Sequence, residues 1–254
     1  TGGDPLILAT AKIRMILERL RAIEHVKIIR IGSKLPVFNP MRIYEDEELL
    51  QTIREHSTPE KRIYIMAHVN HPREITPEAR KAFQALHDAG AIVVNQTPVL
   101  KGINDNPEVL ARLLDELSWA GVTPYYFFIN RPVRGNRDFV LPLEKVYRIV
   151  EEAKAKTSGL GKRVRLVMSH TSGKIEILAI ENGKAYLKYH QSRDDQYGQF
   201  MVLDCPEEAS WFDDLPGNKK YWKKPEKKRH DVISVNQLSD APQKRKASKD
   251  KITI

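Results

Sequence analysis

Polar and glycine residues able to do chemistry recur about every 30 residues along this chain, which is the rhythm of repeated strand–helix units. Each cluster follows a short apolar run. The clusters are Thr1-Gly2-Gly3-Asp4, Arg30-Ile31-Gly32-Ser33, His68-Val69-Asn70-His71-Pro72, Asn95-Gln96-Thr97-Pro98, Ile129-Asn130-Arg131 and Ser169-His170-Thr171-Ser172-Gly173-Lys174. In a parallel β/α barrel the carboxyl ends of the strands face one shared mouth, where active sites are built. The six clusters therefore predict one active site.

The residue types in these clusters point to ligand binding more than to a metal centre. In the first cluster the glycines let the backbone approach a ligand closely, and the aspartate can accept from an ammonium group. His68 and His71 stand three apart, but no third ligand or carboxylate has matching spacing. We therefore predict no metal site among these residues. Lys174 can serve as an amine nucleophile if the barrel mouth desolvates it.

The elements that must hold these clusters follow from hydrophobic periodicity. Apolar residues at helical spacing predict helices over 6–24, 46–56, 76–89, 106–121 and 141–156. Runs rich in β-branched and aromatic residues predict strands over 26–31, 63–69, 91–95, 124–130 and 164–169. A further strand, cut at Thr1, precedes them, which gives five strand–helix repeats and a sixth strand. Because eight repeats close a barrel, six strands predict an α/β fold with an open, partial parallel barrel.

The pattern changes after Lys174. Residues 174–180 and 184–190 alternate in polarity about Asn182-Gly183, which is typical of a β-hairpin. Beyond about residue 212 the chain becomes polar and basic. We therefore predict a partial barrel over 1–175, a β-hairpin extension over 176–212 and a disordered basic tail over 213–254.

Composition limits the function classes. The chain has 254 residues, of which 41% are apolar and 30% charged, as in soluble globular proteins. No apolar run approaches the roughly 20 residues that span a bilayer, and no secretory signal opens the chain. Cys205 is the only cysteine, which excludes an intramolecular disulfide and favours a cytoplasmic location. One cysteine also cannot hold an iron–sulfur cluster by itself. The net charge of +9 is concentrated in the tail, where a solvated terminus is favoured over nucleic-acid binding.

Three longer strings carry a resemblance to a known family. They are His68-Val69-Asn70-His71-Pro72-Arg73-Glu74-Ile75-Thr76-Pro77, Asn95-Gln96-Thr97-Pro98-Val99-Leu100-Lys101-Gly102-Ile103-Asn104-Asp105 and Pro124-Tyr125-Tyr126. Over roughly residues 1–175 the chain closely resembles the lysine 2,3-aminomutase family of radical S-adenosylmethionine (SAM) enzymes. The resemblance implies a partial β/α barrel of the radical SAM type, a [4Fe–4S] cluster, SAM as the radical source and pyridoxal phosphate (PLP).

The resemblance also implies roles for single residues. It assigns Gly2, Gly3 and Asp4 to the amino group of SAM. Arg30 and Ser33 are expected at the carboxylate or ribose of SAM.

Three residues at the next strand ends complete the SAM site that the resemblance implies. Gln96 matches a SAM-contacting glutamine of the family. At the end of the strand before it, with Asn70, either His68 or His71 is expected to hydrogen-bond SAM or to order the strand-end loop. Lys174 falls where the family carries the lysine that forms a Schiff base with PLP, and His170 is expected to assist a substrate contact.

The chain departs from the family pattern in three places. The cluster motif CxxxCxxC is absent, and we expect it upstream of Thr1, so that this chain is a fragment that binds no cluster alone. Arg131 and Ser169 stand where the family has the two aspartates that hold substrate lysine. The glycine-rich run before the PLP lysine is shortened to Ser172-Gly173. These losses predict a substrate other than free lysine.

The function that follows from the resemblance is that of a radical SAM isomerase. It generates a 5′-deoxyadenosyl radical for a 1,2-amino shift on a small amino-acid-like substrate. An electron donor for the cluster is implied, and the extension is open to a role in homo-oligomer contacts. One alternative is a PLP-independent radical SAM enzyme, favoured by the lost aspartates. Another is a non-catalytic barrel whose basic tail binds nucleic acid.

Overall fold

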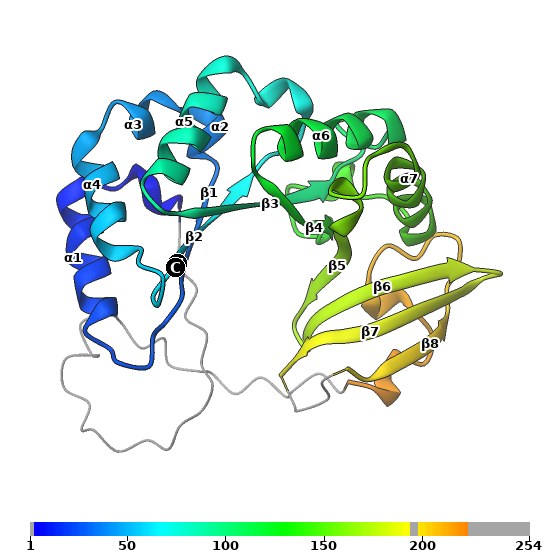
Figure 1. Cartoon of the computed structure of the whole chain (residues 1–254). Helices are drawn as coiled ribbons and strands as arrows, with labels where there is room; N and C mark the ends of the chain where they lie inside the picture. Colours follow the sequence, from blue (N-terminus) through cyan, green and yellow to red (C-terminus); the bar gives the residue numbers. More distant parts are fainter. Residues whose placement is uncertain (1–2, 194–197, 223–254) are drawn as a thin grey trace.

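A computed structural model describes residues 3–193 and 198–222 and shows a single curved sheet with helices along one side (Figure 1). In the described residues the sheet has eight strands in the order β1 to β8. The strands are β1 Ile29–Ser33, β2 Ile63–His68, β3 Ile92–Val99, β4 Thr123–Ile129, β5 Arg165–His170, β6 Gly173–Glu181, β7 Lys184–Ser192 and β8 Phe200–Asp204. The α-helices are α1 Thr10–Arg21, α2 Leu35–Phe38, α3 Met41–Tyr44, α4 Glu47–His56, α5 Pro77–Asp88, α6 Pro107–Trp119 and α7 Leu143–Lys156. Short 3-10 turns are η1 Pro5–Ile7, η2 Pro72–Glu74, η3 Arg137–Phe139, η4 Gly161–Arg163, η5 Phe212–Asp214 and η6 Asn218–Lys220.

The sheet divides into a parallel and an antiparallel part. Strands β1 to β5 pair in parallel, with helices crossing between them on the convex side (Figure 1). Strands β5 to β8 pair antiparallel. The mixed α/β architecture with an open, curved parallel sheet is consistent with the predicted partial barrel.

Local signals explain where the helices start and stop. The Asp46 side chain accepts from the Leu49 amide at the start of α4. The Thr76 hydroxyl accepts from the Ala79 amide at the start of α5, where Pro77 fills the first helical position. These are N-cap bonds that satisfy otherwise unpaired helix amides. Gly90 ends the α5 region at φ +81°, the left-handed conformation that glycine adopts without strain.

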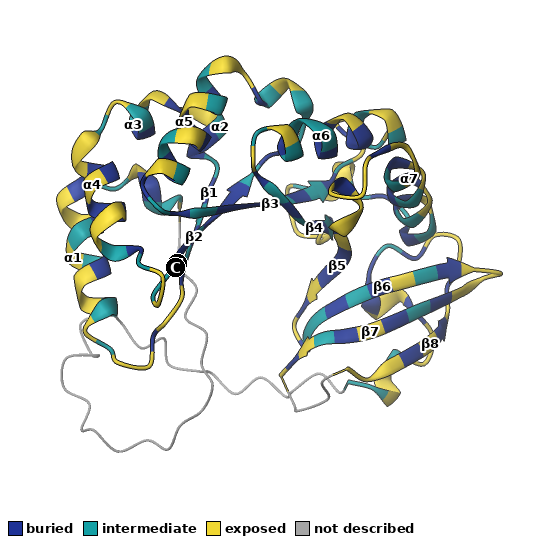
Figure 2. Ribbon diagram, in the orientation of Figure 1, coloured by how far each residue is buried: buried dark blue, intermediate teal, exposed yellow. Residues whose placement is uncertain are grey.

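Alternation along each strand separates the core from the concave face. In β1 the side chains of Ile29 and Ile31 are buried beneath the helices, whereas Arg30 lies between them on the other face. The same buried stripe continues across the sheet and along the inner sides of the helices (Figure 2). The core therefore lies between helices and sheet, and the opposite face is left for ligands.

The structure corrects several predicted boundaries. The helix expected over 6–24 is a 3-10 turn followed by α1, because Ala9 is extended before the helix begins. The strand expected over 91–95 continues to Val99. The sequence analysis predicted neither α2 nor α3, because each has only four residues and shows no helical periodicity. It also did not predict strand β8.

The extension is continuous with the barrel sheet. β6 pairs with β5, with Ser169 opposite Lys174, so the predicted hairpin is the next part of the same sheet. β8 adds a third antiparallel strand to it. After β8 the side chain of Leu215 is buried and Trp222 packs against the core, although both fall in the predicted tail. Residues 223–254 of that tail, and Gly2 of the predicted SAM loop, lie outside the described residues.

None of the described helices is long and apolar enough to cross a bilayer.

Candidate functional site

Strand register places several predicted site residues on the concave face. Residues paired across neighbouring strands point to the same side of a sheet. His68 of β2 pairs with Gln96 of β3, and Gln96 pairs with Tyr126 of β4. Arg30 belongs to the same face, because it pairs with Tyr64, which lies four residues before His68 in β2. The structure thus places Arg30, His68 and Gln96 on one face of the sheet: His68 and Gln96 are paired neighbours, whereas Arg30 lies near the start of β1, four residues away in register. These three residues, with Asn70 in the loop after β2, are called the row below.

Buried polar atoms without partners concentrate at this row. Four buried side-chain nitrogen or oxygen atoms in the described residues have no hydrogen-bond partner. Three of them are Arg30 Nε, His68 Nε2 and Asn70 Oδ1, and the side chains of His68 and Asn70 interact with each other outside good hydrogen-bond geometry. Because an unpaired buried polar atom costs about 1–3 kcal/mol, native proteins rarely retain one without a reason. A polar ligand bound here would supply the missing partners.

The His68 imidazole is held in its neutral form. Burial lowers the pKa of His68 below its usual value, and the charge of Lys34 lowers that pKa further. A neutral ring carries one donor and one acceptor, so His68 can bond either kind of ligand atom through Nε2.

The opening loop is tied to the end of β1 by Asp4. One carboxylate oxygen accepts from the Leu6 amide at 3.0 Å and the other from the Lys34 amide at 2.6 Å. Gly3 has φ +78°, a conformation that favours glycine, and a Cβ there would meet nothing within 4 Å. The Asp4 carboxylate is therefore engaged with backbone amides, and any role toward SAM would use its remaining acceptor capacity.

The side chains of Ser33 and His71 form local hydrogen bonds that stabilise the backbone. The Ser33 side chain is buried on the helix side, and its Oγ accepts from the Leu35 amide at 3.0 Å. Ser33 is thus not on the concave row with Arg30. His71 Nδ1 accepts from the Arg73 amide at 3.1 Å and caps η2. In the described residues no group of three or more His, Cys, Asp or Glu side chains is placed to hold a metal ion.

Asn104, which sequence reasoning gave no role, fixes the loop that carries Asn70. Its side chain is fully buried and accepts from the Leu100 amide at 2.7 Å. It donates to the carbonyl oxygens of Asn70 at 2.8 Å and Pro98 at 3.0 Å. One amide therefore joins the loops that follow β2 and β3.

We expect Asn104→Leu to lower the free energy of unfolding by about 3 kcal/mol, because it leaves a buried amide and two carbonyls with fewer partners. Urea unfolding followed by circular dichroism measures this loss. A change below about 0.5 kcal/mol, the range of ordinary surface substitutions, would show that the two loops do not depend on this side chain.

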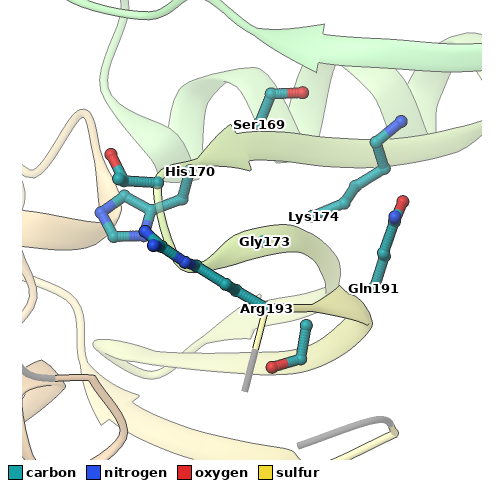
Figure 3. Close-up of a pocket in the computed structure, with 8 residues that line it drawn as sticks. Ser169, His170, Gly173, Lys174, Gln191 and Arg193 are labelled. Atoms are coloured by element: carbon teal, nitrogen blue, oxygen red, sulfur yellow. The ribbon is translucent and has the colours of Figure 1, made fainter. Parts of the chain in front are cut away.

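A second part of the site is a pocket at the junction of β5, β6 and β7. The pocket has a volume of about 360 Å³ and is lined by Ser169, His170, Thr171, Gly173, Lys174, Gln191, Ser192 and Arg193. Figure 3 shows Lys174 and Gln191 on one side of it and Arg193 reaching toward His170 on the other. The Lys174 ammonium lies over the Tyr126 ring, 4.1 Å from its centroid. Lys174 thus faces the concave side of β4.

His170 lines this pocket with both ring nitrogens engaged. Nδ1 accepts from the Ser172 amide at 3.1 Å, so the proton is on Nε2, which donates to Asp213 at 3.1 Å. The rings of Phe212 and Trp222 pack around it. Burial lowers the pKa of His170 below its usual value. These contacts orient the ring and the turn after β5, and the predicted assistance to substrate stays a prediction.

The predicted cofactors fit the chain to different degrees. The unpartnered atoms of Arg30, His68 and Asn70 match a polar ligand such as SAM. Lys174 in its pocket suits an aldehyde cofactor that reacts with amines. A [4Fe–4S] cluster does not fit, because Cys205 is the only cysteine and its side chain is buried.

Comparisons with curated proteins identify relatives of this chain. A protein of Aquifex aeolicus named "Putative L-lysine 2,3-aminomutase" is 50% identical over 216 residues, which are 84% of this chain and 58% of that protein. The L-lysine 2,3-aminomutase of Fusobacterium nucleatum is 42% identical over 159 residues, 63% of this chain and 36% of that protein. The glutamate 2,3-aminomutase of Clostridioides difficile is 34% identical over 173 residues, 68% of this chain and 40% of that protein.

The chain therefore spans only part of each of these relatives, from 36% to 58% of their length. No family model matches the chain.

Proposed function

We propose that this chain, a homologue of the L-lysine 2,3-aminomutases and so related to the radical SAM aminomutases, is part of an enzyme that moves an amino group between adjacent carbons of an amino acid. Relatives named for lysine and for glutamate support an aminomutase-like isomerase without fixing its substrate. The observation that carries the proposal is the group of buried polar atoms of Arg30, His68 and Asn70 that lack a hydrogen-bond partner within the described residues.

SAM is the ligand proposed for this row. Arg30, His68, Asn70 and Gln96 would hold its polar groups, with Gly2, Gly3 and Asp4 near its amino group. When bound there, SAM would supply the carbon radical that begins the reaction. The chain's own contribution is to orient SAM on the concave face and to keep water from the reacting atoms. Ser33 would act through the turn it caps.

PLP is the cofactor proposed for Lys174. It would hold the substrate amine, while the lysine side chain anchors it in the pocket between β5 and β7. The pocket lining in the described residues contains Lys174 and Arg193 as charged groups and no carboxylate. Together with Arg131 and Ser169 in place of the expected aspartates, this supports a substrate other than free lysine.

The cluster ligands must come from residues other than those of this chain. Cys205 is its only cysteine, so the three thiolates are proposed to belong to another part of the full-length protein. We also propose that the enzyme receives electrons for the cluster from a donor, acts on an amino-acid-like substrate and is located in the cytoplasm. Association of identical subunits stays a prediction.

A second candidate is a radical SAM enzyme that does not use PLP. The short Ser172-Gly173 segment before Lys174 favours it, because Gly173 packs so closely on β7 that the turn has little freedom to accommodate a phosphate. The two candidates share the SAM row and differ at Lys174. A non-catalytic scaffold is disfavoured, because it gives no reason to keep three buried polar atoms unpaired.

The test of the SAM row is Asn70→Leu, which removes the unpartnered Oδ1 in a side chain of similar shape. We expect the affinity for SAM to fall about tenfold, equivalent to about 1.4 kcal/mol, because a ligand hydrogen bond is lost. Saturation-transfer NMR with SAM and the intact protein measures the affinity.

The control for this variant is its stability. The free energy of unfolding of Asn70→Leu should fall by less than about 1.5 kcal/mol, well short of the loss in Asn104→Leu, because in the described residues the Asn70 side chain has only the interaction with His68 to lose. A parent protein that gives no SAM signal, or an Asn70→Leu variant that binds SAM as well as the parent, would contradict the proposed role of the row.

A further inference from the structure

A histidine from the antiparallel extension reaches into the concave face of the barrel. His190 of β7 lies with its Nε2 2.7 Å from the hydroxyl of Tyr126, a β4 residue 64 positions earlier in the chain. The two rings meet edge to face, with centroids 5.8 Å apart. The contact joins the extension to the parallel sheet across the face that carries Lys174.

Arg165 determines the direction of the hydrogen bonds in this contact. Its guanidinium lies 3.0 Å from His190 Nδ1 and can only donate, so Nδ1 is an acceptor. The His190 proton is therefore on Nε2 and is donated to the Tyr126 oxygen. Tyr126 in turn donates to the Tyr125 hydroxyl at 3.1 Å. The result is a directed chain of hydrogen bonds from Arg165 to Tyr125.

Glu176 lies beside Arg165, where this series of hydrogen bonds begins. Its Oε2 lies 3.7 Å from the Arg165 guanidinium and 3.8 Å from His190 Nδ1, and its side chain is 18% exposed. The carboxylate balances the Arg165 charge beside the ring. Because β6 supplies Glu176 and β7 supplies His190, two strands of the extension take part.

The Tyr126 ring is the surface on which the Lys174 ammonium lies. The Lys174 nitrogen is 4.1 Å from the Tyr126 centroid and 5.3 Å from that of Phe128, within the range of cation–π attraction. Tyr126 is 2% exposed, and burial with the neighbouring Tyr125 raises the pKa of its hydroxyl well above the usual value. The hydroxyl therefore stays neutral, and the hydrogen bond from His190 adds to the packing that holds the ring.

We propose that His190 is a positioning residue of the Lys174 site: it fixes the Tyr126 ring on which the Lys174 amine rests before a ligand is bound. Its relevance to catalysis rests on the proposed role of Lys174. The extension is then an integral part of the site, because β7 determines where the reactive amine lies.

The position of the Lys174 amine can be measured directly without any cofactor. Reductive methylation with ¹³C-formaldehyde labels lysine amines, and the Lys174 signal is identified by its loss in Lys174→Arg. In the parent protein we expect this methyl signal upfield of those from exposed lysines, because it lies over the face of an aromatic ring.

The decisive variants are at position 190. His190→Leu removes the donor to Tyr126, so the Lys174 signal should move to the position of exposed lysines. His190→Gln keeps an N–H donor and should restore most of the upfield shift. His87→Leu, a histidine outside the site, should leave the shift unchanged. If His190→Leu does not fold, Tyr126→Phe keeps the ring, removes the hydroxyl that His190 holds and should reduce the shift.

Two outcomes would overturn the inference: an unchanged Lys174 signal in folded His190→Leu or Tyr126→Phe, or no upfield signal in the parent. A parallel measurement of the rate of PLP addition should show slower addition in His190→Leu and recovery in His190→Gln. If the parent adds no PLP while the shifts behave as expected, the proposed cofactor fails and the positioning role of His190 stands.

Discussion

A Lys174→Arg variant will form no Schiff base with added PLP, whereas the parent protein will form one at this residue. The guanidinium keeps a positive charge over the Tyr126 ring but stays protonated at any workable pH, so it cannot attack the aldehyde. Borohydride reduction followed by peptide mass spectrometry locates the adduct. In the complete enzyme, turnover should fall by roughly a thousandfold or more, as for other covalent catalytic groups.

The matched control for Lys174→Arg is Lys184→Arg. Lys184 is a β7 lysine that pairs with Asp204 on the surface of the extension, outside the pocket. The Lys184→Arg variant should form the Lys174 adduct in the same yield as the parent protein. Recovery of the main adduct on another lysine of the parent, or an equal yield from Lys174→Arg, would refute the assignment and favour the PLP-independent alternative.

Gly173→Ala will destabilise the protein severely, lowering the free energy of unfolding by about 3 kcal/mol or more. Gly173 has φ +144°, and a Cβ there would overlap the carbonyl oxygen of Gln191 and approach the Ser192 Cα to 2.9 Å. Both neighbours are backbone atoms of β7, so neither can rotate away. Relief requires β6 and β7 to separate at the pocket.

Gly183→Ala is the control for backbone strain without a clash. Gly183 has φ +70° in the turn between the same two strands, and nothing lies within 4 Å of its hypothetical Cβ. We expect a cost of about 1–2 kcal/mol from the left-handed conformation alone. Urea unfolding of both variants separates the two effects, and equal losses would mean that the close packing of Gly173 on β7 contributes nothing.

The parts of the fold that could be predicted from sequence depend on local interactions. The Thr76 cap with Pro77, and the left-handed Gly90 after the helix, are set within a few residues of chain, and the structure has them where expected. The strands expected to end at Val69 and Ser169 end at His68 and His170, within one residue of the prediction, because each apolar run stops there. The strand expected over 26–31 is instead Ile29–Ser33, so Arg30, expected at a strand end, lies near the start of β1, although it shares a face of the sheet with His68 and Gln96.

The remaining features depend on pairing between distant segments. Ser33 was expected to face the ligand beside Arg30, but residues an odd number of positions apart in a strand face opposite sides. Nothing near His190 in sequence marks it as a site residue, since its partner Tyr126 is 64 positions away. Strand β8 was missed although Phe200–Asp204 begins with a short apolar run, and its pairing with β7 identifies it as a strand. The roles assigned to Lys174 and to the SAM row stay predictions.

The order of the strands in space is also their order along the chain, and this bears on how the protein is made. A chain emerging from the ribosome can add each strand to the edge already formed, without waiting for a later segment to be synthesised. Tyr126 of β4 is synthesised 64 residues before its partner His190 of β7. A nascent chain therefore builds β1 to β4 first, and the side chain of Lys174 reaches its ordered position only after β7 has been added.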